Sequence, residues 1–236
     1  MPEIKGPPAQ EIQKIFNSVA HGYDKANDMM TFGMAHRWRK AVVRWSGVKE
    51  NSRVLDCATG TGDLAFEFKR AARKGEVIGT DFCEAMLSHA PKKALDLGLE
   101  VKFQQADVLN LPFEDKSFDV ASIAYGIRNV EDPIRALSEM ARVVRPGGCV
   151  MILETGDGQW PLIDFYFRNV VPRIGGWVTG RRDAYEYLSR SSNKFPSGVE
   201  FLGLMKQTGR FSSVEFKKFI GGGSFVYKGR VSDHNA

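Results

Sequence analysis

The feature that most constrains the fold is a short apolar run that ends in an acid and continues through a glycine loop, Val54-Leu55-Asp56-Cys57-Ala58-Thr59-Gly60-Thr61-Gly62-Asp63. Apolar residues followed by closely spaced glycines and a helical pattern are typical of a buried strand that turns into a helix. Gly60 and Gly62 allow a ligand to approach the backbone closely, and the helix that follows offers amide hydrogens to it. The run therefore predicts a doubly wound α/β fold with a ligand site at the carboxyl end of its first strand.

Short β-rich runs alternate with helical patterns from this motif as far as Thr155. The expected strands are RVLDCA, EVIGTD, VKFQQAD, FDVASIAY and CVMILET, and the expected helices cover residues 63–73, 84–97, 133–144 and, later, 199–207. Such alternation produces right-handed βαβ units and a mostly parallel sheet. Two further runs, SSVEFKKFI and SFVYKGR, are joined by a short glycine-rich link, which favours an antiparallel hairpin. We predict a Rossmann-like, doubly wound, seven-stranded sheet that is mostly parallel and ends in this hairpin.

Two segments lie outside the alternation of strands and helices. Residues 9–20 have helical spacing, and the following HGYDKANDMM is rich in turn-forming residues, so we expect a helix and then a loop. Residues 156–197 are rich in aromatic residues and arginines. We expect one domain over residues 1–236, in which residues 1–50 form a helical lid and residues 156–197 form an insertion that serves the substrate.

Composition argues against several classes of protein. The chain has 33 Lys+Arg and 28 Asp+Glu, and this mild excess of five positive charges is interspersed with acids, which indicates ordinary solubility rather than a nucleic-acid partner. Cys57, Cys83 and Cys149 are far apart and lack nearby histidine pairs, so we expect neither a metal site nor disulfides. Because no apolar stretch approaches the length of a membrane span, we expect a cytoplasmic protein.

Acids stand at the ends of three successive predicted strands, where Asp56, Asp81 and Asp107 are found. Each can cap the helix that follows, but parallel strands share one carboxyl edge, so the three acids should surround a single ligand. Asp56 before the glycines and Asp63 after them suit an ammonium and a sulfonium better than a pyrophosphate. The pattern favours S-adenosylmethionine, with Asp81 accepting the ribose hydroxyls and Asp107, beside Val108, near the adenine amino group.

Three other functions remain open on this evidence. With Ala65 in the third position, the glycine loop also satisfies the relaxed dinucleotide fingerprint, so an NAD-dependent reductase is an alternative. An RNA or DNA methyltransferase shares the fold, although residues 124–127 lack the Asn-Pro-Pro-aromatic run that holds a flipped base. A binding module that holds S-adenosylmethionine without catalysis is the third alternative.

Further motifs run through nearly the whole chain. They are Tyr23-Asp24 with Asn27, Thr31-Phe32-Gly33, His36, Trp38-Arg39, the segment 56–64, Leu111-Pro112-Phe113, Phe118-Asp119, the segments 126–130 and 144–148, Asp183, Tyr185, Tyr187-Leu188 and Phe195-Pro196. This set resembles the ubiquinone/menaquinone biosynthesis C-methyltransferases, a family of class I S-adenosylmethionine-dependent methyltransferases. The Tyr23-Asp24 segment and the Arg128-Asn129 pair are the most specific parts of the resemblance.

The resemblance implies methylation of a ring carbon of a prenylated quinol in menaquinone or ubiquinone biosynthesis, with S-adenosylmethionine as cofactor. The expected cofactor-site residues are Asp56, Gly60, Thr61, Gly62, Asp81, Asp107, Val108 and Ala124. Ala124 stands where the family usually has serine, which removes a hydroxyl near the cofactor. Three further departures fall on the substrate side: Thr155 and Ser192 stand where phenylalanine and isoleucine are usual, and Tyr227 where histidine is common.

The expected catalytic residues are Tyr23, Arg128 and Asn129. A methyl group on a sulfonium is already electrophilic, so the protein must align the acceptor carbon and raise its electron density. We hypothesise that Arg128 stabilises the developing phenolate, that Asn129 orients the ring oxygen and that Tyr23 forms part of the lid. Asp107, or a water that it holds, is the candidate base.

The segment from Trp160 to Gly180 indicates how a membrane-borne substrate could reach the protein. The segment has apolar residues at helical spacing and basic residues nearby. The apolar residues are Trp160, Ile163, Phe167, Val170 and Ile174. The basic residues are Arg168, Arg173, Arg181 and Arg182. Such a helix can rest on an anionic bilayer, or it can be an ordinary core helix. The sequence leaves peripheral membrane contact open, and likewise a homodimer.

Overall fold

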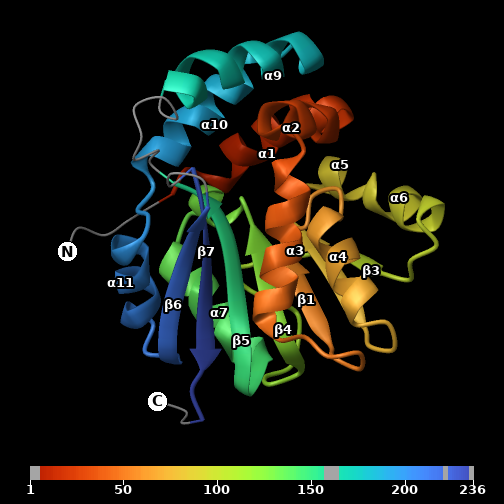
Figure 1. Ribbon diagram of the computed structural model, residues 1–236, viewed down its shortest axis with the longest axis vertical. Helices are drawn as coiled ribbons and strands as arrows, with labels where there is room; N and C mark the ends of the chain where they lie inside the picture. Colours follow the sequence, from red (N-terminus) through yellow and green to blue (C-terminus); the bar gives the residue numbers. More distant parts are fainter. Residues whose placement is uncertain (1–5, 157–164, 220–222, 234–236) are drawn as a thin grey trace.

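Seven strands form one sheet in the computed structural model, which describes residues 6–156, 165–219 and 223–233. The strands are β1 (Val54–Cys57), β2 (Val77–Asp81), β3 (Lys102–Gln105), β4 (Phe118–Ala124), β5 (Val144–Thr155), β6 (Phe211–Phe219) and β7 (Ser224–Val231). Their order is β3-β2-β1-β4-β5-β7-β6 (Figure 1). β1 to β5 pair in parallel, and β7 pairs antiparallel with β5 and β6. The predicted mostly parallel sheet with an antiparallel C-terminal hairpin is confirmed.

Helices cover both faces of the sheet. Every residue of β1 and β2 is buried, as expected for parallel strands between two helical layers. On one face, α3 (Met34–Ser46) and α4 (Asp63–Ala71) pack through a core that includes Val42 and Phe68. On the other, α7 (Pro133–Val143) and α11 (Val199–Gln207) pack through Leu137 and Phe201. Two short helices, α5 (Glu84–Leu87) and α6 (Ala90–Asp96), lie against β2 and β3.

A separate group of helices covers one end of the sheet (Figure 1). This cap consists of α1 (Ala9–Val19), η1 (Ala20–Gly22), α2 (Tyr23–Thr31), the π-helical turn η3 (Tyr166–Val170), α9 (Val171–Thr179) and α10 (Arg182–Lys194). Its helices pack on each other through Val19, Ala26, Ala184 and Tyr185. The cap therefore brings the N-terminal segment against residues 166–194, which follow β5. No helix of the described segments has both the length and the apolar character needed to span a bilayer.

Three expected boundaries differ from the structure. The HGYDKANDMM segment, predicted as a loop, is η1 followed by α2, because Ala26 is buried in the cap and Tyr23 packs beside it. The helix predicted over 84–97 is divided into α5 and α6, with a proline in the first turn of α6. β5 begins at Val144, before the predicted CVMILET run, and its pairing with β4 shifts register there. Trp160 and Ile163 of the predicted amphipathic set lie outside the described residues.

Candidate functional site

A first cavity, of about 160 Å³, lies where the carboxyl ends of β1, β2 and β4 meet α1. We call it the loop cavity. The predicted residues that line it are Gly60, Asp81, Asp107, Val108 and Ala124. Gly60 has a left-handed backbone (φ +57°), which favours glycine at this position in the cavity wall. Five of the eight predicted cofactor-site residues are thus brought together.

Two of the carboxylates that line the loop cavity, Asp81 and Asp107, are held by backbone amides. Asp81 accepts hydrogen bonds from the Gly60 N–H (2.7 Å, to Oδ2) and the Cys83 N–H (2.8 Å, to Oδ1). Asp107 Oδ1 accepts from the Leu109 N–H at 2.9 Å. Burial raises the pKa of Asp81, and the backbone amides act in the opposite direction. A carboxylate oxygen has room for more than one donor, so both groups can accept further hydrogen bonds from ligand hydroxyl or amino groups.

The other three predicted cofactor-site residues do not line the loop cavity. Asp56 is buried beneath the loop, where it accepts hydrogen bonds from the Thr59 and Ser122 hydroxyls, both at 2.6 Å. Burial raises the pKa of Asp56 to about 6. Gly62 directly precedes α4, as its N-cap, and has a left-handed backbone (φ +94°). The Thr61 hydroxyl donates a hydrogen bond to Asp24 at 2.6 Å. These residues hold the loop in place from below and from the side.

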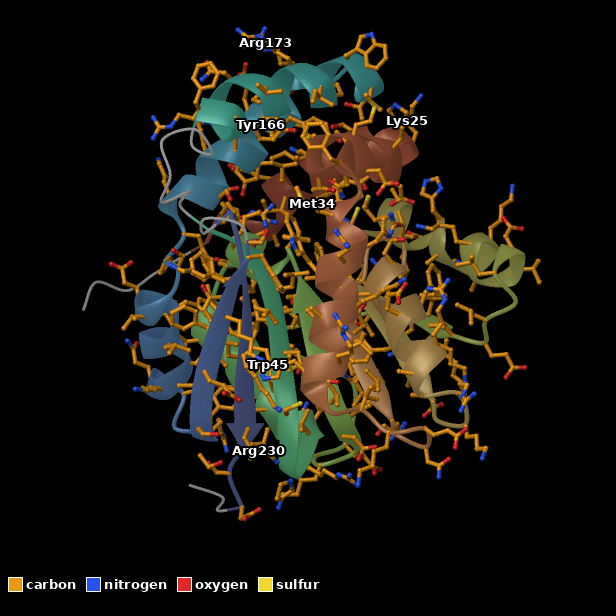
Figure 2. The ribbon with its side chains drawn as sticks, viewed as in Figure 1. Lys25, Met34, Trp45, Tyr166, Arg173 and Arg230 are labelled. Carbon is orange, nitrogen blue, oxygen red and sulfur yellow. The ribbon has the colours of Figure 1, made fainter. Side chains whose placement is uncertain are left out.

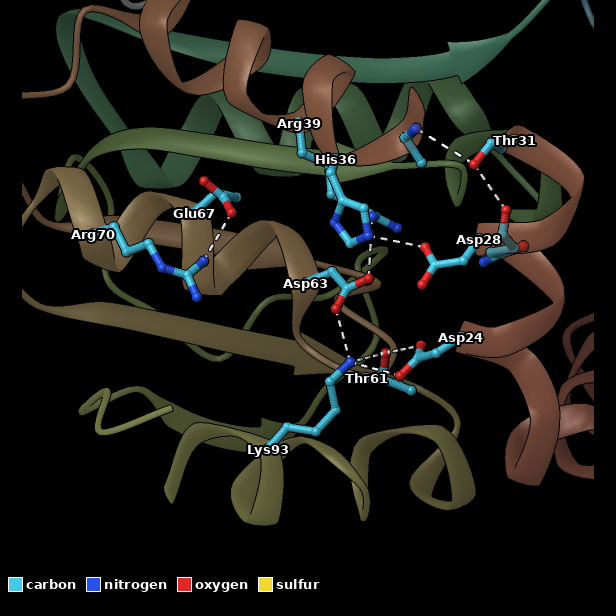
Figure 3. A network of polar contacts seen from close by, with 12 residues as sticks. Asp24, Asp28, Thr31, His36, Arg39, Thr61, Asp63, Glu67, Arg70 and Lys93 are labelled. Carbon is cyan, nitrogen blue, oxygen red and sulfur yellow. Dashed lines mark hydrogen bonds and ion pairs between the residues drawn. The ribbon is translucent and has the colours of Figure 1, made fainter. Parts of the chain in front are cut away.

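Thr61 belongs to a polar network that joins the loop to the cap (Figure 3). Lys93 on α6 donates to Asp24 Oδ2 (2.6 Å), Asp63 Oδ1 (2.7 Å) and Thr61 Oγ1 (3.1 Å). Arg39 on α3 forms an ion pair with Asp63 at 3.1 Å. Burial works to raise the pKa of Asp63, but the charges of Arg39 and Lys93 outweigh it and lower the pKa. The network links four helices to the glycine loop, and the sequence analysis had no signal that Lys93 would join it.

A second cavity, of about 210 Å³, lies between α2, α3, α10 and the end of β5. We call it the apolar cavity, because its walls are mainly Met30, Phe32, Met34, Trp38, Tyr166, Val171 and Leu188. Figure 2 labels Met34 at the start of α3 and Tyr166 in the cap above it. Tyr23 and Tyr125 line both cavities, so the two cavities meet at these rings. Burial raises the pKa of both tyrosine hydroxyls.

Arg128 and Asn129 lie on a short helix, η2 (Ile127–Asn129), at this junction. Arg128 lines the apolar cavity and forms a buried ion pair with Glu154, with side-chain exposures of 7% and 2%. Its Nη1 also donates to the Tyr125 carbonyl at 3.0 Å. Asn129 lines the loop cavity, donates to the same carbonyl at 3.4 Å and accepts from the Tyr187 hydroxyl at 3.2 Å. Arg128 and Asn129, two of the three predicted catalytic residues, therefore line different cavities, and both donate a hydrogen bond to the Tyr125 carbonyl.

Polar atoms without hydrogen bonds gather in the apolar cavity. Among the described residues, five buried side-chain atoms have no hydrogen-bond partner: Arg39 Nη1, Tyr125 Oη, Arg128 Nε, Tyr185 Oη and Ser224 Oγ. All five residues line this cavity. Four of these atoms have a polar neighbour: Arg39 Nη1 pairs with Asp63, the Tyr125 and Ser224 hydroxyls lie near each other, and Thr179 lies near the Tyr185 hydroxyl. Arg128 Nε has none among the described residues. An unsatisfied buried polar group costs about 1–3 kcal/mol, so this nitrogen suits a mainly apolar ligand that places one polar acceptor against it.

Glu154 and Tyr125 were missed as site residues in the sequence analysis. Glu154 lies near the end of β5, so the reasoning that selected Asp56, Asp81 and Asp107 would also have selected Glu154. Tyr125 follows β4 with a left-handed backbone (φ +57°), which no local pattern predicts for a tyrosine.

Known proteins are similar to this chain over most of its length. A family model described as the ubiE/COQ5 methyltransferase family matches residues 5–230. The ubiquinone/menaquinone biosynthesis C-methyltransferase UbiE of Bdellovibrio bacteriovorus is 52% identical over 229 residues, which cover 95% of this chain and 97% of that protein. The demethylmenaquinone methyltransferase of Thermus thermophilus is 42% identical over 199 residues, covering 83% and 90%. A solved SAM-dependent methyltransferase from Aquifex aeolicus shares the fold (TM-score 0.61, 21% identity, coverage 82% and 89%).

Proposed function

The chain belongs to the ubiE/COQ5 methyltransferase family, and from this premise we propose that it methylates a ring carbon of a prenylated quinol, in menaquinone or ubiquinone biosynthesis. The observation that carries the proposal is the junction of two unlike cavities at Tyr23 and Tyr125. One has carboxylates suited to a nucleoside, and the other is apolar with a few polar atoms. A methyl donor in the first and a ring with an apolar tail in the second would meet between these two tyrosines.

The loop cavity fits S-adenosylmethionine, which supplies an electrophilic methyl group on a sulfonium when bound. We assign Asp81 to the ribose hydroxyls and Asp107, beside Val108, to the adenine amino group, because both carboxylates are fixed by amides and keep acceptor capacity. Asp107 lines only the loop cavity, so we give it this role rather than that of the base. Asp56, Thr61 and Gly62 support the loop. Calorimetric titration of Asp81→Asn with S-adenosylmethionine should show weaker binding, with a His89→Gln variant as a surface control.

Arg128 is the residue that we assign to the acceptor oxygen. Its Nε is buried, has no hydrogen-bond partner among the described residues and belongs to a side chain that lines the apolar cavity. A guanidinium N–H in a water-poor site stabilises charge that develops on a phenolate. Asn129 has both ends of its amide engaged, with Tyr125 and Tyr187, so we assign it to positioning the junction rather than to contact with the ring oxygen.

The cap supplies the lid that we propose over both ligands. Of the first fifty residues, α1 contributes to the loop cavity and α2 contributes Asn27 and Met30 to the apolar cavity, whereas α3 both lines the apolar cavity, through Met34 and Trp38, and packs on the sheet. From residues 156–197, α10 contributes Leu188 and Ser192. The N-terminal helices thus contribute to the walls of both cavities, and the segment that follows β5 contributes to the wall of the apolar cavity.

The test is transfer of radiolabel from S-adenosylmethionine to membrane lipid extract, before and after reduction with dithionite, with mass analysis of the labelled product. Label that enters a quinone only after reduction supports the proposal, and the mass separates benzoquinol from naphthoquinol acceptors. Arg128→Met should lose turnover while still binding S-adenosylmethionine. Cofactor binding without any labelled lipid would contradict the quinol assignment.

We also propose that the cap touches an anionic bilayer when it takes up the substrate. Phe32 lines the apolar cavity and is nevertheless 75% exposed, which marks the mouth of that cavity. Trp177 is 77% exposed on α9, and Arg173 lies on the outer side of the same helix (Figure 2). Exposed aromatic residues beside arginines favour the interface of an anionic membrane. Phe32→Ser and Trp177→Ser should reduce flotation with anionic liposomes, whereas Leu95→Ser, on α6 and 80% exposed, should not.

A further inference from the structure

Two hydroxyl residues of the apolar cavity form a chain that ends on Glu154. Ser192 on α10 is hydrogen-bonded to the Thr155 hydroxyl at the end of β5, and both residues line the cavity. Thr155 Oγ1 donates to Glu154 Oε1 at 3.1 Å, and the Thr155 N–H donates to the same oxygen at 2.7 Å.

The direction of these hydrogen bonds is fixed by the carboxylate. Glu154 is ion-paired with Arg128, and an ionised carboxylate can only accept hydrogen bonds. The Thr155 hydroxyl must therefore donate its one hydrogen to Glu154, and it can offer Ser192 only a lone pair. The Ser192 hydrogen is then used on Thr155. What Ser192 presents to the cavity is an acceptor, in a side chain that is 2% exposed.

We propose that Thr155 and Ser192 form a selectivity element that accepts a hydrogen bond from a ring hydroxyl of the acceptor and so favours a reduced quinol over its oxidised quinone. The inference rests on the proposed function and deepens it. A quinol hydroxyl can donate to Ser192, whereas a quinone carbonyl has only lone pairs and would face another acceptor in a buried site.

This selectivity would serve the reaction in two ways. The reduced ring is the electron-rich form that can attack the methyl group, so rejection of the quinone keeps an unreactive ligand out of the site. A row of hydroxyls that ends on an anion also polarises along its length, so a quinol hydroxyl that donates into it gains electron density at its oxygen. Ser192 and Thr155 need not take the proton for either effect.

The experiment measures how strongly the full-length protein prefers one oxidation state. The ligands are 2-geranyl-1,4-naphthoquinone and its dithionite-reduced quinol, titrated calorimetrically under anaerobic conditions with S-adenosylhomocysteine present. The variants are Ser192→Ala and Thr155→Val, and the control is Ser191→Ala, on the same helix α10, whose hydroxyl donates to the Leu188 carbonyl and which is not among the residues that line the cavity. Circular dichroism and S-adenosylhomocysteine binding establish that each variant is folded.

We expect the unmodified protein to bind the quinol about tenfold more tightly than the quinone, which corresponds to about 1.4 kcal/mol. Ser192→Ala should lose most of this preference through weaker quinol binding. Thr155→Val frees the Ser192 hydrogen, so it should lose the preference through tighter quinone binding. Ser191→Ala should retain it.

An unchanged preference in both folded variants, in a protein that methylates the quinol, overturns the selectivity element and leaves the proposed function intact. A protein that neither binds nor methylates the quinol overturns both.

Discussion

Replacing Glu154 by glutamine tests how strongly the buried ion pair holds the site together. The substitution keeps the shape of the side chain and removes its charge, so the Arg128 guanidinium stays buried without a counterion. Both partners are almost fully enclosed, with exposures of 2% and 7%, so water can compensate very little. Breaking such a pair from one side typically costs about 3–5 kcal/mol. We expect Glu154→Gln near the lower limit, about 3 kcal/mol, because the Tyr125 carbonyl still accepts a hydrogen bond from Arg128.

Removing both charges should be far less harmful than removing one. In Arg128→Met/Glu154→Leu no charge is left uncompensated, so we expect its free energy of unfolding to lie within about 1 kcal/mol of the unmodified protein. The single and double variants form a cycle whose interaction free energy should exceed about 2 kcal/mol. Because Arg128 is assigned to the acceptor oxygen, the double variant should nevertheless be inactive.

The assay is urea unfolding followed by circular dichroism, with S-adenosylhomocysteine binding as a check of the loop cavity. The reasoning requires equal m values across the cycle, so that differences in midpoint report stability. A loss below about 1 kcal/mol in Glu154→Gln, or a double variant as unstable as the sum of the singles, would refute a coupled and desolvated pair.

Three further outcomes follow from other parts of the molecule. Burial raises the pKa of Asp56 from 3.8 to about 6, so ionisation of this group opposes folding and its contribution to stability should fall as the pH rises from 4 to 6. Relative to Asp56→Asn, the free energy of unfolding measured in urea should drop by roughly 3 kcal/mol across this range. Equal pH dependence in the two proteins would contradict this prediction. Lys93→Met leaves two carboxylates of the network in Figure 3 without their shared cation, and because these groups are partly exposed we expect a loss of about 1 kcal/mol that shrinks in high salt. Gly175→Ala places a Cβ 2.1 Å from the Tyr185 ring and should destabilise the protein by about 1–3 kcal/mol. Gly203→Ala in α11, where a Cβ would meet open space, should stabilise it by about 0.5–1 kcal/mol. The melting temperatures of the two variants should therefore shift in opposite directions.

The central sheet could be predicted because its signals are local. β1, β2 and β4 are short, largely buried runs followed by turn residues, and helical patterns follow the predicted first, second and fourth strands, which favours a parallel order. The segment 21–30 could not be predicted in this way, since its Gly, Asp and Asn residues favour a loop. It becomes helical because Ala26 is buried against a helix more than a hundred residues later, and tertiary burial overrides local propensity.

The structure brings five of the eight predicted cofactor-site residues to one cavity and places the other three outside it. Acids at strand ends located the loop cavity, because parallel strands necessarily bring these positions to one edge. The backbone conformation decides the direction of each side chain. Thr61 therefore donates to Asp24 in the cap, and Asp56 accepts a hydrogen bond from Ser122 beneath the loop. The apolar cavity is formed by α2, α3 and α10 together, so no single segment of the sequence predicts it.

Tyr125 has a left-handed backbone, and it lines both cavities. A tyrosine held there at φ +57° carries local strain, which the hydrogen bonds from Arg128 and Asn129 to its carbonyl help to maintain. Glycine would relieve that strain, but it would also delete the ring that the two cavities share and merge them into one open space. Loss of a packed aromatic ring typically costs about 3–5 kcal/mol, more than the roughly 1–3 kcal/mol of backbone strain, so tyrosine at 125 is both the more stable residue and the one that keeps a wall between the two cavities.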